Sequence, residues 1–238
     1  MLKGILKILA IFVVGIFGGI FGSQILWPYF VERPLFLEYR LEQRPIYLTE
    51  KKETRIQENV ALQEAIEKVK SSVSGIQTKT KKGKILEGSG LILTTDGLIL
   101  TLAELVPEDS TSTVFLENEN VSTQVLKRDI KQNLALLKIE RGKLPTVSFG
   151  DFEKMKLGQR VFLVGIVFLE KKPQKIVNEG ILSYFDQNLI ETNIFEKENL
   201  IGSSLFNIEG NFLGLNFLDE DGKIVSIPAK KIREFAGF

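Results

Sequence analysis

The most informative absence in this sequence of 238 residues is histidine, of which there is none. Histidine is the usual general base of nucleophilic hydrolases and the usual ligand of first-row transition metals. Its absence excludes a Ser–His–Asp, Cys–His or His–zinc mechanism carried by this chain alone. Cysteine is absent too, which excludes disulfides, thiol nucleophiles and cysteine-ligated clusters. We expect neither a cofactor nor a metal.

An excess of charge is also lacking, because 31 Lys and Arg face 30 Asp and Glu for a net charge of +1. That balance, without any basic block, excludes a strongly basic nucleic-acid binder, so no nucleic-acid partner is expected. The 44% of hydrophobic residues supplies enough apolar material for a packed core, which excludes a solvated disordered chain.

Charge is missing altogether from residues 8–27, which read ILAIFVVGIFGGIFGSQILW. A helix of that length, at about 1.5 Å per residue, spans a hydrocarbon core of about 30 Å. Lys3 and Lys7 precede it and aromatic residues follow it, which favours a cytoplasmic N-terminus and an extracytoplasmic remainder, periplasmic or extracellular. We therefore expect residues 1–30 to form a single-pass membrane anchor. A cleaved signal peptide is the alternative, but the run is long for one and no clear cleavage site follows.

The predicted membrane helix contains two G-x-x-x-G spacings, Gly15–Gly19 and Gly18–Gly22. Glycine faces let two transmembrane helices approach closely, so this face is a candidate for homo-oligomerisation, as is the β-rich domain that follows. The alternative is that glycine is simply common in such helices.

Residues 31–75 are expected to form a stalk that ends in an amphipathic helix. Prolines at three positions between residues 28 and 45 argue against one continuous helix there. Thr54 and Gln57 have capping-box spacing. Apolar residues then recur at helical spacing at Leu62, Ile66, Val69 and Val73. We expect this face to pack on the following domain, whereas a coiled coil between chains is the alternative.

From about Ser74 onward, short apolar runs alternate with Asp-Gly and Gly-Asn turn signals, which is typical of an all-β sandwich or barrel. The stretches GSGLILTTDGLILTL (88–102) and GSSLFNIEGNFLGLN (202–216) echo each other. The echo predicts two similar halves, 76–148 and 149–238, that together form one compact unit.

Six colinear blocks of this domain resemble the trypsin-like serine peptidases of the HtrA/Deg group. The blocks are EGSGLILTTDGLILTLAELV (87–106), VLKRDIKQNLALLKIE (125–140), LPTVSFGDFEKMKLGQRVFLVGIVF (144–168), VNEGILS (177–183), LIETNIFEKENLIGSSLFNIEGNFLGLN (189–216) and VSIPAKKI (225–232). The resemblance implies two six-stranded β-barrels, 76–148 and 149–238, with a cleft between them. The sequence ends directly after the second barrel, so we expect the family's peptide-binding PDZ domain to be missing.

The resemblance breaks down at the three positions that carry catalysis in the family. Glu104 stands where the family has its histidine, Asn133 where it has its aspartate, and Ile201 where it has its nucleophilic serine. We expect Asn133 to donate a hydrogen bond to the Glu104 carboxylate, because an aspartate there would face a like charge. The oxyanion turn is also altered, to Asn199-Leu200-Ile201. Ser203 and Ser204 are the nearest hydroxyls, at positions that do not face the cleft in the family.

The family's substrate-pairing strand corresponds to Asn216, Phe217 and Leu218. Backbone pairing needs an open strand edge rather than a triad, so these residues are the candidate peptide-binding edge. A covered edge is the alternative.

The function that the resemblance implies is a membrane-anchored, catalytically inactive HtrA/Deg-type domain that binds or scaffolds a protein or peptide partner outside the cytoplasm, in protein quality control. Two alternatives remain. One is an active serine endopeptidase of the same group, and the other is a structural subunit of a membrane complex.

Overall fold

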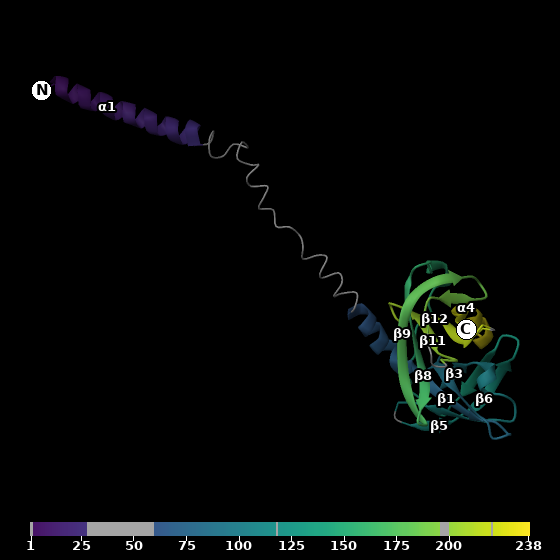
Figure 1. Cartoon of the computed structure of the whole chain (residues 1–238). Helices are drawn as coiled ribbons and strands as arrows, with labels where there is room; N and C mark the ends of the chain where they lie inside the picture. The colour runs from purple at the N-terminus through teal and green to yellow at the C-terminus, as the bar shows by residue number, and fades with distance from the viewer. Residues whose placement is uncertain (1, 28–59, 118, 196–199, 220) are drawn as a thin grey trace. The chain divides into compact units, whose positions relative to one another are not determined.

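A computed structural model describes residues 2–27, 60–117, 119–195, 200–219 and 221–238 (Figure 1). The chain divides into two compact units, Met1–Thr54 and Arg55–Phe238. The expected stalk prolines and the capping box at Thr54 and Gln57 lie outside the described residues.

The first unit contains one long apolar helix. Helix α1 (Leu2–Phe21) runs into a π-helical turn, η1 (Gly22–Leu26), and the Trp27 N–H bonds to the carbonyl of Gly22. The stretch Lys3–Leu26, 24 residues long, is long and apolar enough to cross a membrane. It begins earlier than the predicted residue 8, because the two lysines near its start do not interrupt a helix. Its described side chains are nearly all exposed.

The first half of the second unit is a seven-stranded antiparallel sheet. Its strands are β1 (Val73–Lys79), β2 (Ile85–Ile92), β3 (Leu98–Thr101), β4 (Thr111–Phe115), β5 (Asn120–Ser122), β6 (Gln124–Asp129) and β7 (Leu134–Lys138), in the order β5-β4-β1-β2-β3-β7-β6.

The sheet closes on itself through one residue, Thr123, which links its two edge strands β5 and β6. The Thr123 N–H donates to Ser112 O in β4 at 3.2 Å, and its hydroxyl donates to Lys138 O in β7 at 2.9 Å. The expected count of six strands is therefore wrong for this half. One long strand is interrupted at Thr123, where the chain crosses from β4 to β7, and the interruption produces seven.

The second half is a closed barrel of six strands, as expected. The strands are β8 (Arg160–Leu169), β9 (Lys172–Phe185), β10 (Ile190–Thr192), β11 (Ser204–Asn207), β12 (Phe212–Leu218) and β13 (Ile224–Pro228), in the order β10-β13-β12-β11-β8-β9. The two echoing stretches form corresponding hairpins, β2–β3 and β11–β12. Their turns use glycine at positive φ, +99° at Gly97 and +78° at Gly210, which residues with a Cβ rarely adopt.

Two helices pack on the barrels. Residues 60–69 are helical and bury Ala65 and Val69 in the core shared with β11 and β12, while the Lys68 ammonium donates to Glu209 O at 3.1 Å. This confirms the packed helix. The helical pattern was expected to continue to Val73, which instead begins β1 and pairs with Leu91. Near the C-terminus, α4 (Ala229–Ala236) covers β12 and β13.

Candidate functional site

The side chains of Glu104 and Asn133, two of the positions that the resemblance aligns with the family's triad, bond to each other. Glu104 lies in a 3₁₀ turn, η6 (Ala103–Leu105), and Asn133 stands just before β7 with φ +52°. The Asn133 Nδ2 donates to Glu104 Oε1 at 2.9 Å, and the Glu104 backbone N–H donates to Asn133 Oδ1 at 3.1 Å. The predicted hydrogen bond is therefore confirmed, and a second bond accompanies it. The side-chain amide of Asn133 thus donates one hydrogen bond to Glu104 and accepts another from it. An aspartate could not hold Glu104 in this way, because an ionised carboxylate only accepts hydrogen bonds.

Ile201 occupies the third position and presents only hydrocarbon. Its carbonyl accepts the Ser89 N–H from β2 at 2.9 Å. The next residue, Gly202, has φ +76°, and a Cβ there would lie 2.2 Å from Ser89 O. This contact fixes the turn against the first barrel. Glu104 and Ile201 line one hollow of about 500 Å³, so the structure brings these two predicted positions together, while Asn199 lies outside the described residues.

The two serines nearest to Ile201 in the sequence, Ser203 and Ser204, are both buried. Ser203 Oγ accepts from Asn216 Nδ2 at 2.8 Å, and the Ser226 hydroxyl donates to Asn216 Oδ1. Ser204 is fully buried, and its hydroxyl has no hydrogen-bond partner among the described residues. A buried hydroxyl without an adjacent base does not act as a nucleophile on an external substrate.

The candidate peptide-binding edge on β12 is only partly open. The Asn216 N–H donates to Ser203 O and its carbonyl accepts from Gly202 N, both at 2.8 Å. Asn216 is also 1% exposed. The expectation that Asn216 offers backbone groups to a partner is therefore wrong, because the turn after Ile201 folds back and occupies them.

The open part of the strand edge is at Leu218 and not at Asn216. Asp219 N donates to Lys223 O, and antiparallel strands alternate between bonded and non-bonded pairs. Phe217 and Val225 lie opposite each other and are then a hydrogen-bonded pair. Leu218 and Ile224 also lie opposite each other, but they are a non-hydrogen-bonded pair. The Leu218 N–H and carbonyl consequently face away from β13. Within the described ranges, neither group has a hydrogen-bond partner.

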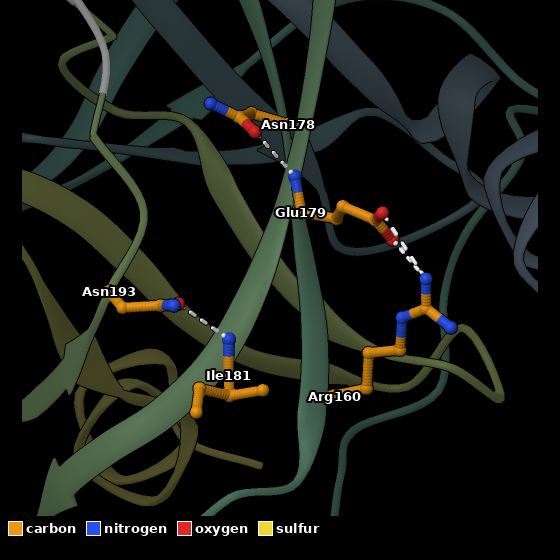
Figure 2. Close-up of polar contacts among 5 residues, drawn as sticks. All are labelled: Arg160, Asn178, Glu179, Ile181 and Asn193. Carbon is orange, nitrogen blue, oxygen red and sulfur yellow. Dashed lines mark hydrogen bonds and ion pairs between the residues drawn. The ribbon is translucent and has the colours of Figure 1, made fainter.

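The segment that leads into the loop before Ile201 is anchored on the edge of β9 by amide side chains. Figure 2 shows the Ile181 N–H bonded to Asn193 Oδ1, at 2.7 Å, and the Glu179 N–H bonded to Asn178 Oδ1, also at 2.7 Å. The Asn178 amide donates to Phe195 O at 3.2 Å. A Cβ at Gly180 would lie 2.3 Å from Asn193 Oδ1, so the glycine makes this close approach feasible.

Sequence reasoning missed a second hollow, of about 240 Å³, beside Asn133. It lies between the turn at Lys131 and Gln132 and the start of α4 at Lys231, with Phe217 in its wall. These segments are far apart in the chain, and no local motif links them. The hollow becomes apparent only in the folded barrels, whose register brings these segments together.

A turn next to this second hollow is held by Asp186. Its carboxylate accepts the backbone N–H groups of Asn188 at 2.7 Å and Leu189 at 2.8 Å, and the Tyr184 hydroxyl at 3.2 Å. The two backbone bonds are the main reason that the pKa of Asp186 lies below its ordinary value, and Lys231 adds a weaker attraction. Asp186 is therefore an anion already engaged by its own turn.

Among the residues that the structure describes, no group of three or more Asp or Glu side chains is arranged to hold a metal ion.

Comparison with known proteins identifies the class of the domain. Residues 88–215 match the family described as "Trypsin-like peptidase domain", which is more than half of the chain, and the chain therefore belongs to that family.

Curated relatives define its type further. A "Probable periplasmic serine endoprotease DegP-like" from Halomonas elongata is 32% identical over 139 residues, which cover 54% of this chain and 28% of that protein. "Serine protease HTRA1" from Xenopus laevis is 33% identical over 165 residues, 62% of this chain and 35% of that protein. The domain is thus of HtrA/DegP type. The chain spans about a third of the length of these relatives.

Solved structures agree on the fold. A serine endoprotease from Yersinia pestis superposes with a TM-score of 0.66 at 21% identity, over 74% of this chain and 65% of that one. "HtrA-type protease AlgW with tripeptide" gives a TM-score of 0.65 at 21% identity, over 74% and 62%. The two-barrel trypsin-like fold is therefore shown.

Proposed function

We propose that this chain is a membrane-anchored, catalytically inactive HtrA/Deg-type domain that binds an extended segment of a protein partner outside the cytoplasm. The observation that carries the proposal is the arrangement of Glu104, Asn133 and Ile201. Two of these side chains satisfy each other, and the third has no atom that can attack a carbonyl.

The chemistry of amide cleavage needs a nucleophile, a base within reach of it and a group that orients the base. Ile201 supplies no nucleophile, and Ser203 and Ser204 are buried. Glu104 could accept a proton, but no hydroxyl bonds to its carboxylate among the described residues, and the chain contains no imidazole. Each of the three roles is therefore vacant, which supports inactivity.

The N-terminal helix supports the proposed location. The 24-residue apolar stretch Lys3–Leu26 suffices to span a bilayer. Lys3 and Lys7 at its start favour an N-terminus in the cytoplasm, an orientation that supports a β-domain on the other side of the membrane. The DegP-like relatives are named as periplasmic proteins, in agreement with that placement.

Binding by β-addition is supported by the edge at Leu218. An extended segment that pairs there would gain two backbone hydrogen bonds without any catalytic group. Leu218 is also 36% exposed, so the strand end is accessible at the surface of the described residues.

The experiment uses the full chain in lipid nanodiscs and a fluorescent, permanently unfolded polypeptide, namely reduced and carboxymethylated α-lactalbumin. Binding should be saturable by fluorescence anisotropy, and mass spectrometry should recover the polypeptide intact. Leu218→Pro removes the outward N–H without touching the ladder to β13 and should weaken binding about tenfold, the value of about one hydrogen bond. Leu218→Ala keeps that N–H and is the matched control. Cleaved product, or equal binding by both variants, would refute the proposal.

A further inference from the structure

Two ammonium groups from different barrels line the hollow beside Asn133. Lys131 belongs to the turn between β6 and β7, and Lys231 to the first turn of α4. Phe217 and Ile227 form the apolar part of the wall, and the exposed amides of Gln132 and Asn188 lie at its rim. The hollow, of about 240 Å³, has room for one side chain.

Neither lysine forms an ion pair within the described part of the chain. Two acids close to them in the fold, Asp129 and Asp186, accept hydrogen bonds from the backbone of their own turns. Asp129 accepts the backbone N–H groups of Lys131 at 2.8 Å and Gln132 at 3.1 Å, and Asp186 holds the Asn188 turn as described above. The hollow therefore combines two ammonium groups that form no ion pair among the described residues, half-buried at Lys231 and exposed at Lys131, and the attraction between Lys231 and Asp186 is only a weak one. An anion between them would receive charge-assisted hydrogen bonds.

The strand register directs one side chain of a bound segment into this hollow. A residue that pairs with Leu218 across an antiparallel ladder has its side chain on the same face as Leu218. The residues before and after it point to the opposite face, which is the face of Phe217. Since Phe217 lines the hollow, the flanking residue opposite Phe217 has its side chain on the face of β12 where the hollow lies.

From this geometry we propose that the hollow selects an acidic residue, aspartate or glutamate, next to the residue that pairs with Leu218, and that Lys131 and Lys231 bind its carboxylate. The inference rests on the proposed function, because it assigns a partner class to the same edge. An unfolded or extended protein segment with an isolated acidic residue among apolar ones is the expected partner.

The test measures binding of synthetic ten-residue peptides to the full chain in nanodiscs. Each position in turn is fixed as Glu, Gln, Lys or Ser in an otherwise mixed pool. All peptides are acetylated at the N-terminus and amidated at the C-terminus, so that a carboxylate at the fixed position is always a side chain. A parallel pool with a free C-terminus reports whether a terminal carboxylate substitutes for that side chain. At low ionic strength, Glu should bind about fivefold more tightly than Gln at one position, as expected for two solvent-accessible ion pairs, and salt should reduce this ratio.

Variants identify the groups responsible. The double variant Lys131→Gln with Lys231→Gln should abolish the Glu preference while peptides still bind. Lys230→Gln, a neighbouring lysine outside the hollow, should leave the preference unchanged.

Binding without a Glu preference, a preference that survives the double variant, or a stronger response to the free C-terminus than to Glu would overturn the inference and leave the proposed function standing. Failure of every pool to bind would overturn both.

Discussion

Replacing Asn133 by aspartate tests the hydrogen-bonded pair of Glu104 and Asn133. The substitution keeps the oxygen that accepts the Glu104 backbone N–H, but it turns the Nδ2 donor, which lies 2.9 Å from Glu104 Oε1, into a second carboxylate oxygen. One hydrogen bond is lost, at about 1 kcal/mol. Two like charges about 4 Å apart add about 1 kcal/mol in water and about 4 at an effective dielectric constant of 20. Because the Glu104 side chain is exposed, the lower figure applies, and the total is about 2 kcal/mol at pH 7.

Urea unfolding of the full chain in detergent measures this loss of stability. The unfolding is monitored by circular dichroism and not by tryptophan fluorescence. The swapped pair Glu104→Gln with Asn133→Asp is the control, since the new glutamine amide can donate to the new carboxylate. It should recover most of the 2 kcal/mol. Stability of Asn133→Asp equal to that of the unaltered chain, or a swapped pair no more stable than the single variant, would refute the reasoning.

Two further predictions concern the stability of the β-domain. Gly202→Ala forces a Cβ to within 2.2 Å of a backbone oxygen at φ +76° and should cost about 3 kcal/mol or more in thermal unfolding, whereas Gly142→Ala, with no atom within 4 Å, should cost little. The side-chain bond to Lys138 lowers the pKa of Asp96 to about 2. Stabilisation by Asp96 should thus be complete above its ordinary pKa of about 3.8 and be lost as the pH falls towards 2. Acid titrations of Asp96→Asn should lack that decline, and parallel curves for the two proteins would contradict the assignment.

Much of the fold and half of the site could be predicted from the sequence, because they depend on local patterns. The hairpins follow from apolar alternation around Asp-Gly and Gly-Asn pairs, and the six colinear blocks placed both barrels. The bond between Glu104 and Asn133 was predictable since both residues lie inside recognisable blocks and a neutral amide can donate to a carboxylate.

The remaining features depend on contacts between segments that are distant in sequence. The division of a strand at Thr123 follows from where the sheet must close, which no local pattern records. The loss of the Asn216 edge depends on a turn thirteen residues upstream that folds back onto it. The hollow at Lys131 and Lys231 joins the first barrel to α4, and exposed lysines give no periodic signal in the sequence.

The central claim is that the hollow lined by Glu104 and Ile201 contains no group that attacks an acyl or phosphoryl centre. Treating the purified full chain with a fluorophosphonate and measuring the intact mass tests it most directly, with an active DegP-like protease treated in parallel as the positive control. We expect the mass of this chain to remain unchanged while the control gains one adduct. A single stoichiometric adduct that maps to a serine beside Ile201 would contradict the account.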